Sequence, residues 1–284
     1  MSTSQPSNRR RAKSASPPAA TEPTTVSTPL LAEQLRELRL PMFRDHFASL
    51  AERALTEPMS HPQYLAELTE LECQARRESR IARLHRQSRL PSAKTWDAFD
   101  WSRLPLQLAR QMESLRDGTF LDRRENLLVF GKPGVGKSHC LCALGEQLIH
   151  QGRSVLFTTC SLLVQDLLIA KRDLSLAKAI KRLSRFEGLI IDDLGYVQQS
   201  REEMEVLFTL LAERYERGSV MLTSNLPFSK WEQIFKDAMT TAAAIDRLVH
   251  HSVILELNVP SYRMKDAQDK ETTAPKKRNK TSKK

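Results

Sequence analysis

The chain has 284 residues, of which 40% are hydrophobic and 27% are charged. This length and composition predict a globular protein with one substantial domain and a smaller module. The formal net charge of +10 favours an anionic partner, either nucleic acid or an acidic membrane surface. Because no apolar run is long enough to span a bilayer, we expect nucleic acid and no membrane partner.

The four cysteines are Cys73, Cys140, Cys142 and Cys160. They have neither C-x-x-C spacing nor a paired histidine pattern, which argues against a zinc site and against a disulfide framework. We therefore expect a protein of the reducing cytoplasm, with Cys140 and Cys142 packed as small buried residues.

Both ends of the chain are basic and poor in large apolar residues. Residues 1–29 contain the cluster Arg9-Arg10-Arg11, and residues 266–284 contain Lys276-Lys277-Arg278. Segments of this composition cannot bury enough surface to fold alone, so we expect a disordered basic arm and a disordered basic tail. Each end is either a solubilising terminus or a DNA contact.

Residues 30–90 are predicted to form a small helical module. Thr28 and Pro29 supply a helix cap and a first-turn proline. Three leucines follow with the spacing of one helical face, namely Leu31, Leu35 and Leu38. Further along, Ser60 and Gln63 have the spacing of a capping box, which predicts the start of another helix.

The last helix of this module carries a row of arginines. Arg76, Arg80 and Arg83 are spaced i, i+4 and i+7, with Arg77, Arg86 and Arg89 nearby, which makes six arginines over fourteen residues. A rigid helix holds such charges together, so we predict that Arg76, Arg77, Arg80 and Arg83 contact the phosphates of DNA. A solvated helix face is the alternative.

Residues 91–121 are predicted to link this module to the domain that follows. They carry three large aromatic side chains, Trp96, Phe99 and Trp101. Because aromatic side chains bury much apolar surface, we expect these three to pack against the following domain. A place in the wall of a ligand pocket is the alternative.

The most specific motif of the chain is a phosphate-binding loop. Residues 131–138 match the Walker A pattern G-x-x-x-x-G-K-[ST], between the apolar run 126–130 and a helix-like stretch from 138 to 150. Backbone N–H groups of such a loop, together with the helix N-terminus, cradle phosphate oxygens. We expect Lys137 at the β/γ-phosphates and Ser138 on Mg²⁺. The predicted binding residues are Gly131, Lys132, Pro133, Gly134, Val135, Gly136, Lys137, Ser138 and His139.

A second acidic motif follows at residues 188–193. A short apolar run ends in Asp192 and Asp193, which predicts a buried parallel strand. Such a strand delivers its acids to the carboxyl edge of the sheet, where ligands of open α/β sheets bind. We expect Asp192 to help hold Mg²⁺ and Asp193 to polarise the attacking water.

Three further apolar runs, at 154–159, 220–225 and 253–257, alternate with helical stretches. With the two runs already described they predict an α/β P-loop domain over residues 122–265, built on a five-stranded parallel sheet. Asn225 ends one run, where its amide is placed to hold the attacking water or the γ-phosphate. A role in a turn is the alternative.

Arg247 lies on a helical stretch before the last run. It is a candidate arginine finger, a residue that stabilises the transferring phosphoryl group and is often supplied by a neighbouring subunit. An ion pair with Asp246 or Glu256 is the alternative.

The order of these motifs resembles an AAA+ ATPase of the DnaA/DnaC clade. Residues 189–196, 223–225, 246–248 and 261–263, behind a helical module, more specifically resemble the IstB family of transposition helper ATPases. The resemblance covers about residues 30–265. It implies ATP and Mg²⁺ as cofactors, assembly as a homo-oligomer on duplex DNA, and delivery of that DNA to a separately encoded transposase. It also implies that hydrolysis resets the complex, in a bacterial, cytoplasmic and nucleoid-associated setting.

Two other functions share parts of this pattern. A DnaC-like helicase loader has the same motor residues, so these motifs do not separate helper from loader. A P-loop small-molecule kinase shares the loop but is disfavoured by the Asp192-Asp193 pair, Asn225 and Arg247, and a GTPase is disfavoured because an N-K-x-D motif is absent. Residues 258–260 depart from the IstB pattern, which often has a glycine there.

Overall fold

The computed structural model describes residues 28–195, 200–235 and 237–262. The chain divides into two compact units, Met1–Ala75 and Arg76–Lys284, and the division falls within α3 (His61–Ser88). The arm predicted over residues 1–29 lies outside the described residues except for its last two positions. The tail predicted over 266–284 lies outside them entirely. The other predicted domain boundaries stay predictions.

The first unit packs helices against one another. It contains α1 (Thr28–Glu37), α2 (Pro41–Thr56) and the first part of α3. The leucines that these helices bury are Leu35, Leu50 and Leu68. The capping box is confirmed, because the backbone N–H of Ser60 donates to the side chain of Gln63 and the N–H of Gln63 donates to the Ser60 hydroxyl. Local sequence therefore fixes where α3 begins.

The second unit is built on a sheet of five parallel strands in the order β2-β3-β4-β1-β5. The strands are β1 (Asn126–Gly131), β2 (Val155–Thr159), β3 (Gly188–Leu194), β4 (Ser219–Ser224) and β5 (Ser252–Leu257). The longer helices are α4 (Leu106–Leu115), α6 (Lys137–His150), α7 (Cys160–Arg172), α8 (Leu176–Leu183), α9 (Arg201–Arg214) and α11 (Ala238–Val249). The short elements are η1 (Trp101–Arg103), α5 (Thr119–Asp122), η2 (Phe228–Lys230) and α10 (Glu232–Phe235). The predicted five-stranded parallel α/β fold is confirmed.

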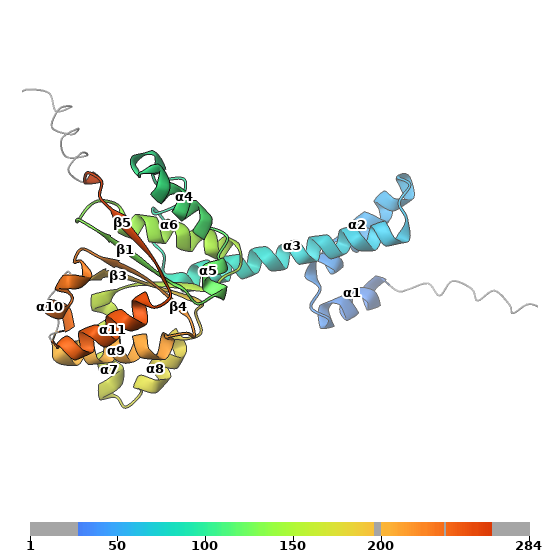
Figure 1. Cartoon of the computed structure of the whole chain (residues 1–284). Coiled ribbons are helices and arrows are strands. Elements are labelled where there is room, and N and C mark those ends of the chain that lie inside the picture. The colour runs from blue at the N-terminus through green and yellow to red at the C-terminus, as the bar shows by residue number, and fades with distance from the viewer. Residues whose placement is uncertain (1–27, 196–199, 236, 263–284) are drawn as a thin grey trace, which may run out of the picture. The chain divides into compact units, whose positions relative to one another are not determined.

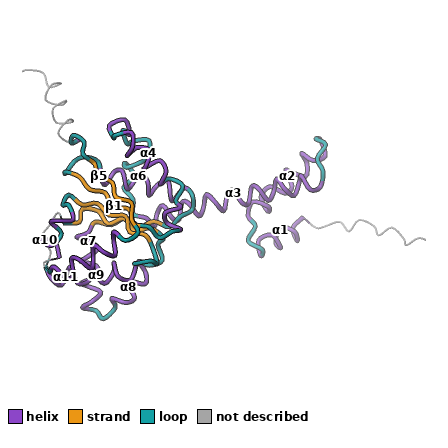
Figure 2. The backbone as a smooth tube through the Cα atoms, viewed as in Figure 1, coloured by secondary structure: helices purple, strands orange, loops and turns teal. Residues whose placement is uncertain are grey.

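The sheet separates two layers of helices (Figure 1), and an apolar core lies on each of its faces. Side chains of a strand point alternately to opposite faces. In β1, Leu127 and Val129 pack with α4 and α6, whereas Leu128 and Phe130 pack with α7, α9 and α11. Figure 2 shows the strands between these two helical layers. The inner strands are therefore covered on both faces, and this explains why they appear in the sequence as continuous apolar runs.

A buried arginine holds the backbone at the starts of two strands. Arg214, at the end of α9, is 2% exposed. Its guanidinium donates to four backbone carbonyls, those of Leu183, Phe186, Glu187 and Ser219. Burial lowers the pKa of Arg214 to about 10, so the side chain stays charged at neutral pH. These contacts tie the end of α8 to the starts of β3 and β4.

The elements differ from the sequence prediction in one main respect. The helical stretch expected between the apolar runs 154–159 and 188–193 is two helices, α7 and α8, separated by a turn at Leu174, whose φ is +52°. In the described ranges, no helix is both long enough and apolar enough to cross a membrane.

Candidate nucleotide-binding site

The predicted phosphate-binding loop joins β1 to α6. Gly134 has a φ of +82° and Gly136 a φ of +98°, both in the left-handed region that favours glycine. Gly136 is also the N-cap of α6. A Cβ atom at Gly136 would lie 3.0 Å from the ring of Phe99 and 3.2 Å from that of Tyr262. Glycine is therefore required there by backbone geometry and by space.

Lys137 begins α6 and is 6% exposed. Its ammonium donates to the carbonyl oxygens of Gly131 (2.9 Å) and Lys132 (3.1 Å), which holds the charge inside the loop. Ser138 follows in the first turn of the helix, partly buried. The loop thus presents a cation and a helix N-terminus in one place, an arrangement suited to phosphate.

The acidic pair lies at a β-bulge. Ile191 pairs with Leu222 and Leu194 pairs with Ser224, so Asp192 and Asp193 together oppose the single residue Thr223. The Thr223 hydroxyl donates to the buried Asp192 carboxylate (2.6 Å) and accepts from the backbone N–H of Asp193 (2.8 Å). Asp193 is exposed, with a φ of +61°.

The bulge gives the two carboxylates different surroundings. Asp192 is 4% exposed and accepts a hydrogen bond from the Thr223 hydroxyl, whereas Asp193 is exposed to solvent at the sheet edge. Bulges often lie next to active sites, where they change the direction of a side chain. Sequence reasoning found the two acids but missed Thr223, whose contact depends on the register between β3 and β4.

Packing brings the loop helix close to the acidic strand. A Cβ atom at Gly145 of α6 would lie 2.9 Å from Ile190 of β3. Cys142 lies one turn after Ser138, and its pKa is raised to about 12 by burial, with a further contribution from the Asp192 carboxylate. Because β1, β4 and β3 run parallel, the loop that follows β1 and Asp192 near the end of β3 lie at the same edge of the sheet.

Asn225 follows β4 at this same edge. It lines a cavity of about 220 Å³ together with Gly131 and Lys132 of the loop. Its Oδ1 atom is buried and has no hydrogen-bond partner among the described residues. A buried acceptor without a partner is costly in a folded protein and is common at functional sites. Asn225 therefore lines the same cavity as the loop, and its role toward the attacking water or the γ-phosphate stays a prediction.

An aromatic cluster covers the other side of the loop. Trp96 stacks on Trp101 with ring centroids 4.0 Å apart, and Phe99 is 5% exposed. The three belong to or pack on the core formed by β1 and α6, which confirms their predicted packing. His139 lies edge-on to Phe99, and its Nε2 atom is 3.1 Å from the carbonyl oxygen of Thr95. Burial lowers the pKa of His139.

Tyr262 connects the end of the described chain to the loop. Its backbone N–H donates to the carbonyl of Gly134 (2.9 Å), and its hydroxyl donates to the carbonyl of Asp100 (3.1 Å). The guanidinium of Arg103 lies 3.6 Å from the ring centroid. Sequence reasoning assigned Tyr262 no role, because a contact across 128 residues leaves no local signal. The neighbouring Arg263 lies outside the described residues.

Arg247 is not at its own phosphate loop. The carbonyl of Arg247 accepts from the side chain of Asn126, the first residue of β1, whereas the loop follows the last residue of β1. Its guanidinium donates to the carbonyl of Ala243 (3.0 Å) and lies 4.9 Å from the ring centroid of Phe208. Among the described residues it forms no ion pair with Asp246 or Glu256, which removes that alternative.

The predicted DNA-contacting arginines lie on the part of α3 that belongs to the second unit. Arg76, Arg77, Arg80 and Arg83 are all exposed. Arg80 donates to the carbonyl of Gly152, just after the end of α6 (3.0 Å). That bond gives Arg80 a structural contact in addition to its predicted role.

Comparison with known proteins identifies the family. The model of the IstB-like ATP-binding protein family matches residues 33–270. An insertion-sequence ATP-binding protein of Sinorhizobium fredii, y4iQ/y4nD/y4sD, is 41% identical over 246 residues, which cover 86% of this chain and 83% of that protein. The insertion sequence IS21 ATP-binding protein of Pseudomonas aeruginosa is 34% identical over 232 residues, covering 82% and 88%.

Solved structures show the same fold. The chain matches the DnaC helicase loader with a TM-score of 0.51 at 15% identity, over 59% of this chain and 98% of that one. It matches AMPPCP-bound DnaA from Aquifex aeolicus with a TM-score of 0.51 at 15% identity, over 65% and 56%. The five-stranded parallel α/β unit therefore shares its fold with these two structures. Together with the family match, this shows that the chain belongs to the IstB-like ATP-binding proteins of insertion sequences.

Proposed function

We propose that the chain is an ATP-dependent, DNA-binding helper ATPase of insertion-sequence transposition. It binds ATP with Mg²⁺, assembles as a homo-oligomer on duplex DNA, and delivers this DNA to a separately encoded transposase in the bacterial cytoplasm. Hydrolysis of ATP to ADP and phosphate then resets the complex. The observation that carries the proposal is the convergence of the phosphate loop, the Asp192-Asp193 bulge and Asn225 at one edge of the sheet.

The residues present fit ATP and Mg²⁺. The helix N-terminus and the Lys137 ammonium suit the β/γ-phosphates. Oxygen ligands suit Mg²⁺, and Ser138 and Asp192 would provide them. When bound, Mg²⁺ would offset the negative charge of the phosphates. Thr223 holds the Asp192 carboxylate in one orientation, so less ordering is needed when the metal binds.

Two further residues are proposed to act on the attacking water. Asp193 is exposed at the bulge, where its carboxylate can accept a proton from water. Asn225 has a buried acceptor next to the loop and is assigned to hold the water or the γ-phosphate. The Thr223 hydroxyl that donates to the Asp192 carboxylate also accepts from the Asp193 backbone N–H. One hydroxyl therefore contacts both the proposed metal ligand and the residue proposed to activate water.

Arg247 is proposed to act on the site of a neighbouring subunit. β1 has six residues, so its two ends lie roughly 16 Å apart at about 3.3 Å per residue. Arg247 is anchored at the amino end and the loop lies at the carboxyl end. That separation supports a finger supplied in trans, as in assemblies where one subunit completes the next subunit's site.

The choice of helper over helicase loader rests on the relatives. The curated proteins that resemble this chain are named as ATP-binding proteins of insertion sequences. The likeness to the DnaC helicase loader concerns the fold. A transposition partner is therefore favoured.

A strand-transfer assay tests the proposed function. The purified chain is added to the transposase of the same insertion sequence, with element ends and a target plasmid, and insertions are counted with ATP, with ADP and without nucleotide. We expect insertions to rise with ATP and to fall to the level without nucleotide for Lys137→Ala. The control variant Lys171→Ala removes a partly exposed lysine of α7 and should behave as the parent. Insertion that is independent of the chain would overturn the proposal.

A further inference from the structure

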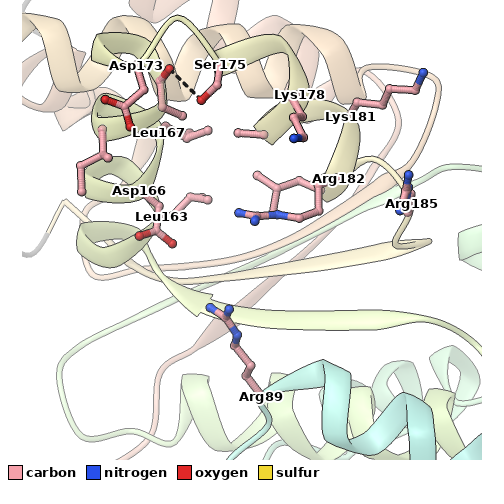
Figure 3. A pocket seen from close by; sticks show the side chains of 14 residues that line it. Arg89, Leu163, Asp166, Leu167, Asp173, Ser175, Lys178, Lys181, Arg182 and Arg185 are labelled. Atoms are coloured by element: carbon pink, nitrogen blue, oxygen red, sulfur yellow. Dashed lines mark hydrogen bonds between the residues drawn. The ribbon is translucent and has the colours of Figure 1, made fainter.

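A cleft lies between the end of α3 and α8, within the second unit. It consists of two cavities of about 660 and 480 Å³ that share six lining residues and are therefore continuous. One wall is Arg86 and Arg89, at and just after the end of α3. Figure 3 shows the larger cavity, with Arg89 facing the residues of α7 and α8. The opposite wall is α8 with the turn that follows it, and α7 lines the space beside α8 with residues such as Leu163, Asp166 and Leu167.

The cleft is strongly basic. Its cationic lining residues are Arg86, Arg89, Lys178, Lys181, Arg182 and Arg185, against the two carboxylates Asp166 and Asp173. All six cations are exposed. Among the described residues, none of the six forms an ion pair or a side-chain hydrogen bond, whereas other surface arginines, such as Arg123 and Arg217, are paired with glutamates. Six unpaired cations around one hollow repel one another and favour an anionic ligand.

The fold holds both walls in place. Ile180 and Leu183 of α8 are buried, so the lysines and arginines lie on the opposite face of that helix. On the other wall, Ser88 is fully buried and Arg89 has a φ of +57°, which ends α3 and turns the Arg89 side chain toward the cleft. Leu90 then packs against Gly145 of α6. The backbone elements that carry the charges are therefore held in place before any ligand binds.

We propose that this cleft binds the sugar-phosphate backbone of duplex DNA, an inference that rests on the proposed function and names its DNA-contacting surface. Arginine forks match phosphate oxygens in pairs, and several cations in a row follow a strand of regularly spaced phosphates. Contacts of this kind read no base edges, so binding is independent of sequence. Arg83 precedes Arg86 by one turn of α3, so the cleft continues the arginine row from Arg76 to Arg83.

The test compares two variants of equal charge in the full-length protein. The cleft variant is Arg89→Gln/Arg182→Gln/Arg185→Gln. The matched control is Arg110→Gln/Arg123→Gln/Arg217→Gln, which removes three exposed arginines outside the cleft. Affinity for two duplexes of unrelated sequence is measured by fluorescence anisotropy with ATP, over about 50–200 mM salt.

For the cleft variant we expect the slope of log K against log salt to become shallower by about three, one for each phosphate contact removed. The dissociation constant should rise about tenfold or more for both duplexes. The control should keep the parent slope. Both variants should bind ATP as the parent does, because the substituted residues lie away from the phosphate loop.

Several outcomes would contradict the inference. If the cleft variant keeps the parent's salt slope, or if the cleft and control variants lose duplex affinity equally, the cleft is not the DNA-binding surface. The proposed function would stand in either case. A parent that binds no duplex would overturn the DNA-binding part of the proposed function and the cleft with it. Polyglutamate that binds the parent more tightly than duplex and loses this affinity in the cleft variant would assign the cleft to an acidic protein segment.

Discussion

Thr223 is the residue whose contacts connect the two candidate catalytic carboxylates. Its hydroxyl donates to Asp192 and accepts from the backbone of Asp193, at the position where one residue of β4 faces two of β3. A hydrogen bond to a charged group contributes about 1.5–3 kcal/mol. The orientation of both acids therefore depends on one hydroxyl group.

Thr223→Val keeps the shape of the side chain and removes both hydrogen bonds. We expect ATP hydrolysis to fall by roughly 10- to 100-fold, in line with the loss of about 1.5–3 kcal/mol, while ATP binding by the loop persists. Thr223→Ser restores the hydroxyl and should recover most of the activity. Steady-state phosphate release and binding of labelled ATP measure the two effects. If the serine variant is as slow as the valine variant, the hydroxyl is not the cause.

Asp193→Asn and Lys137→Ala should fail at different steps. Asp193→Asn leaves Asp192 and the loop intact, so we expect it to bind ATP, to hydrolyse it slowly and to accumulate on DNA. Lys137→Ala removes the cation held inside the loop and should lose productive ATP binding. Labelled ATP binding and single-turnover hydrolysis separate these cases. Normal turnover in Asp193→Asn would place the base elsewhere.

His139 makes the region around the loop sensitive to acid. Burial lowers the pKa of His139 below its ordinary value of 6.5, so the folded protein holds it neutral. The unfolded chain then binds more protons as pH falls, and stability is full above about pH 6.5 and declines below it. We expect the midpoint of thermal unfolding to fall less between pH 7 and pH 5.5 in His139→Gln than in the parent. If the midpoint of thermal unfolding falls equally in the variant and the parent, groups other than His139 cause the loss of stability at low pH.

At the scale of elements, the row of arginines on α3 has a mixed environment. Arg80 is bonded to the carbonyl of Gly152, and Arg83 is exposed. We predict that Arg76→Gln/Arg80→Gln/Arg83→Gln weakens duplex binding equally for all sequences and flattens the salt dependence by up to about three. The control Arg110→Gln/Arg123→Gln/Arg217→Gln, used above for the cleft, applies here too. An unchanged slope would assign this row to a solvated or structural surface.

Much of the α/β unit could be predicted from sequence, because its inner strands are covered on both faces and therefore appear as apolar runs. The phosphate loop is a local motif, since its glycines and Lys137 act within eight residues of one another. The strand order, the division into α7 and α8, and the contacts of Tyr262 depend on residues far apart in the chain. Such contacts follow from packing and register, for which composition and spacing carry no signal.

The same contrast holds for the candidate site. Asp192, Asp193 and Asn225 could be placed at one sheet edge because parallel strands deliver their carboxyl ends together. The bulge that separates the two acids could not be predicted, because it exists only in the pairing of β3 with β4. Arg247 was expected on a helix before the last strand, and it lies there on α11. Its distance from the loop followed only from the structure.

At the scale of the whole molecule, the position of Arg247 predicts that activity requires neighbouring subunits. Arg247→Ala subunits have intact loops, and Lys137→Ala subunits have intact fingers. When the two are mixed, we expect hydrolysis above the sum of the separate variants, because some interfaces combine an intact loop with an intact finger. Co-assembly is checked by pull-down with two tags. Co-assembly without recovery of activity would assign Arg247 to its contacts with Ala243 and Phe208.

The most direct test of the central claim is sedimentation of the full-length protein with a duplex of defined length, in ATP, in ADP and without nucleotide, with electron microscopy of the peak fractions. ATP should yield large, ordered particles that contain both protein and DNA, and these should persist longest with Asp193→Asn. ADP should yield smaller species, because hydrolysis resets the complex. Particles that form equally well in all three conditions, or that exclude the duplex, would contradict ATP-dependent assembly on DNA.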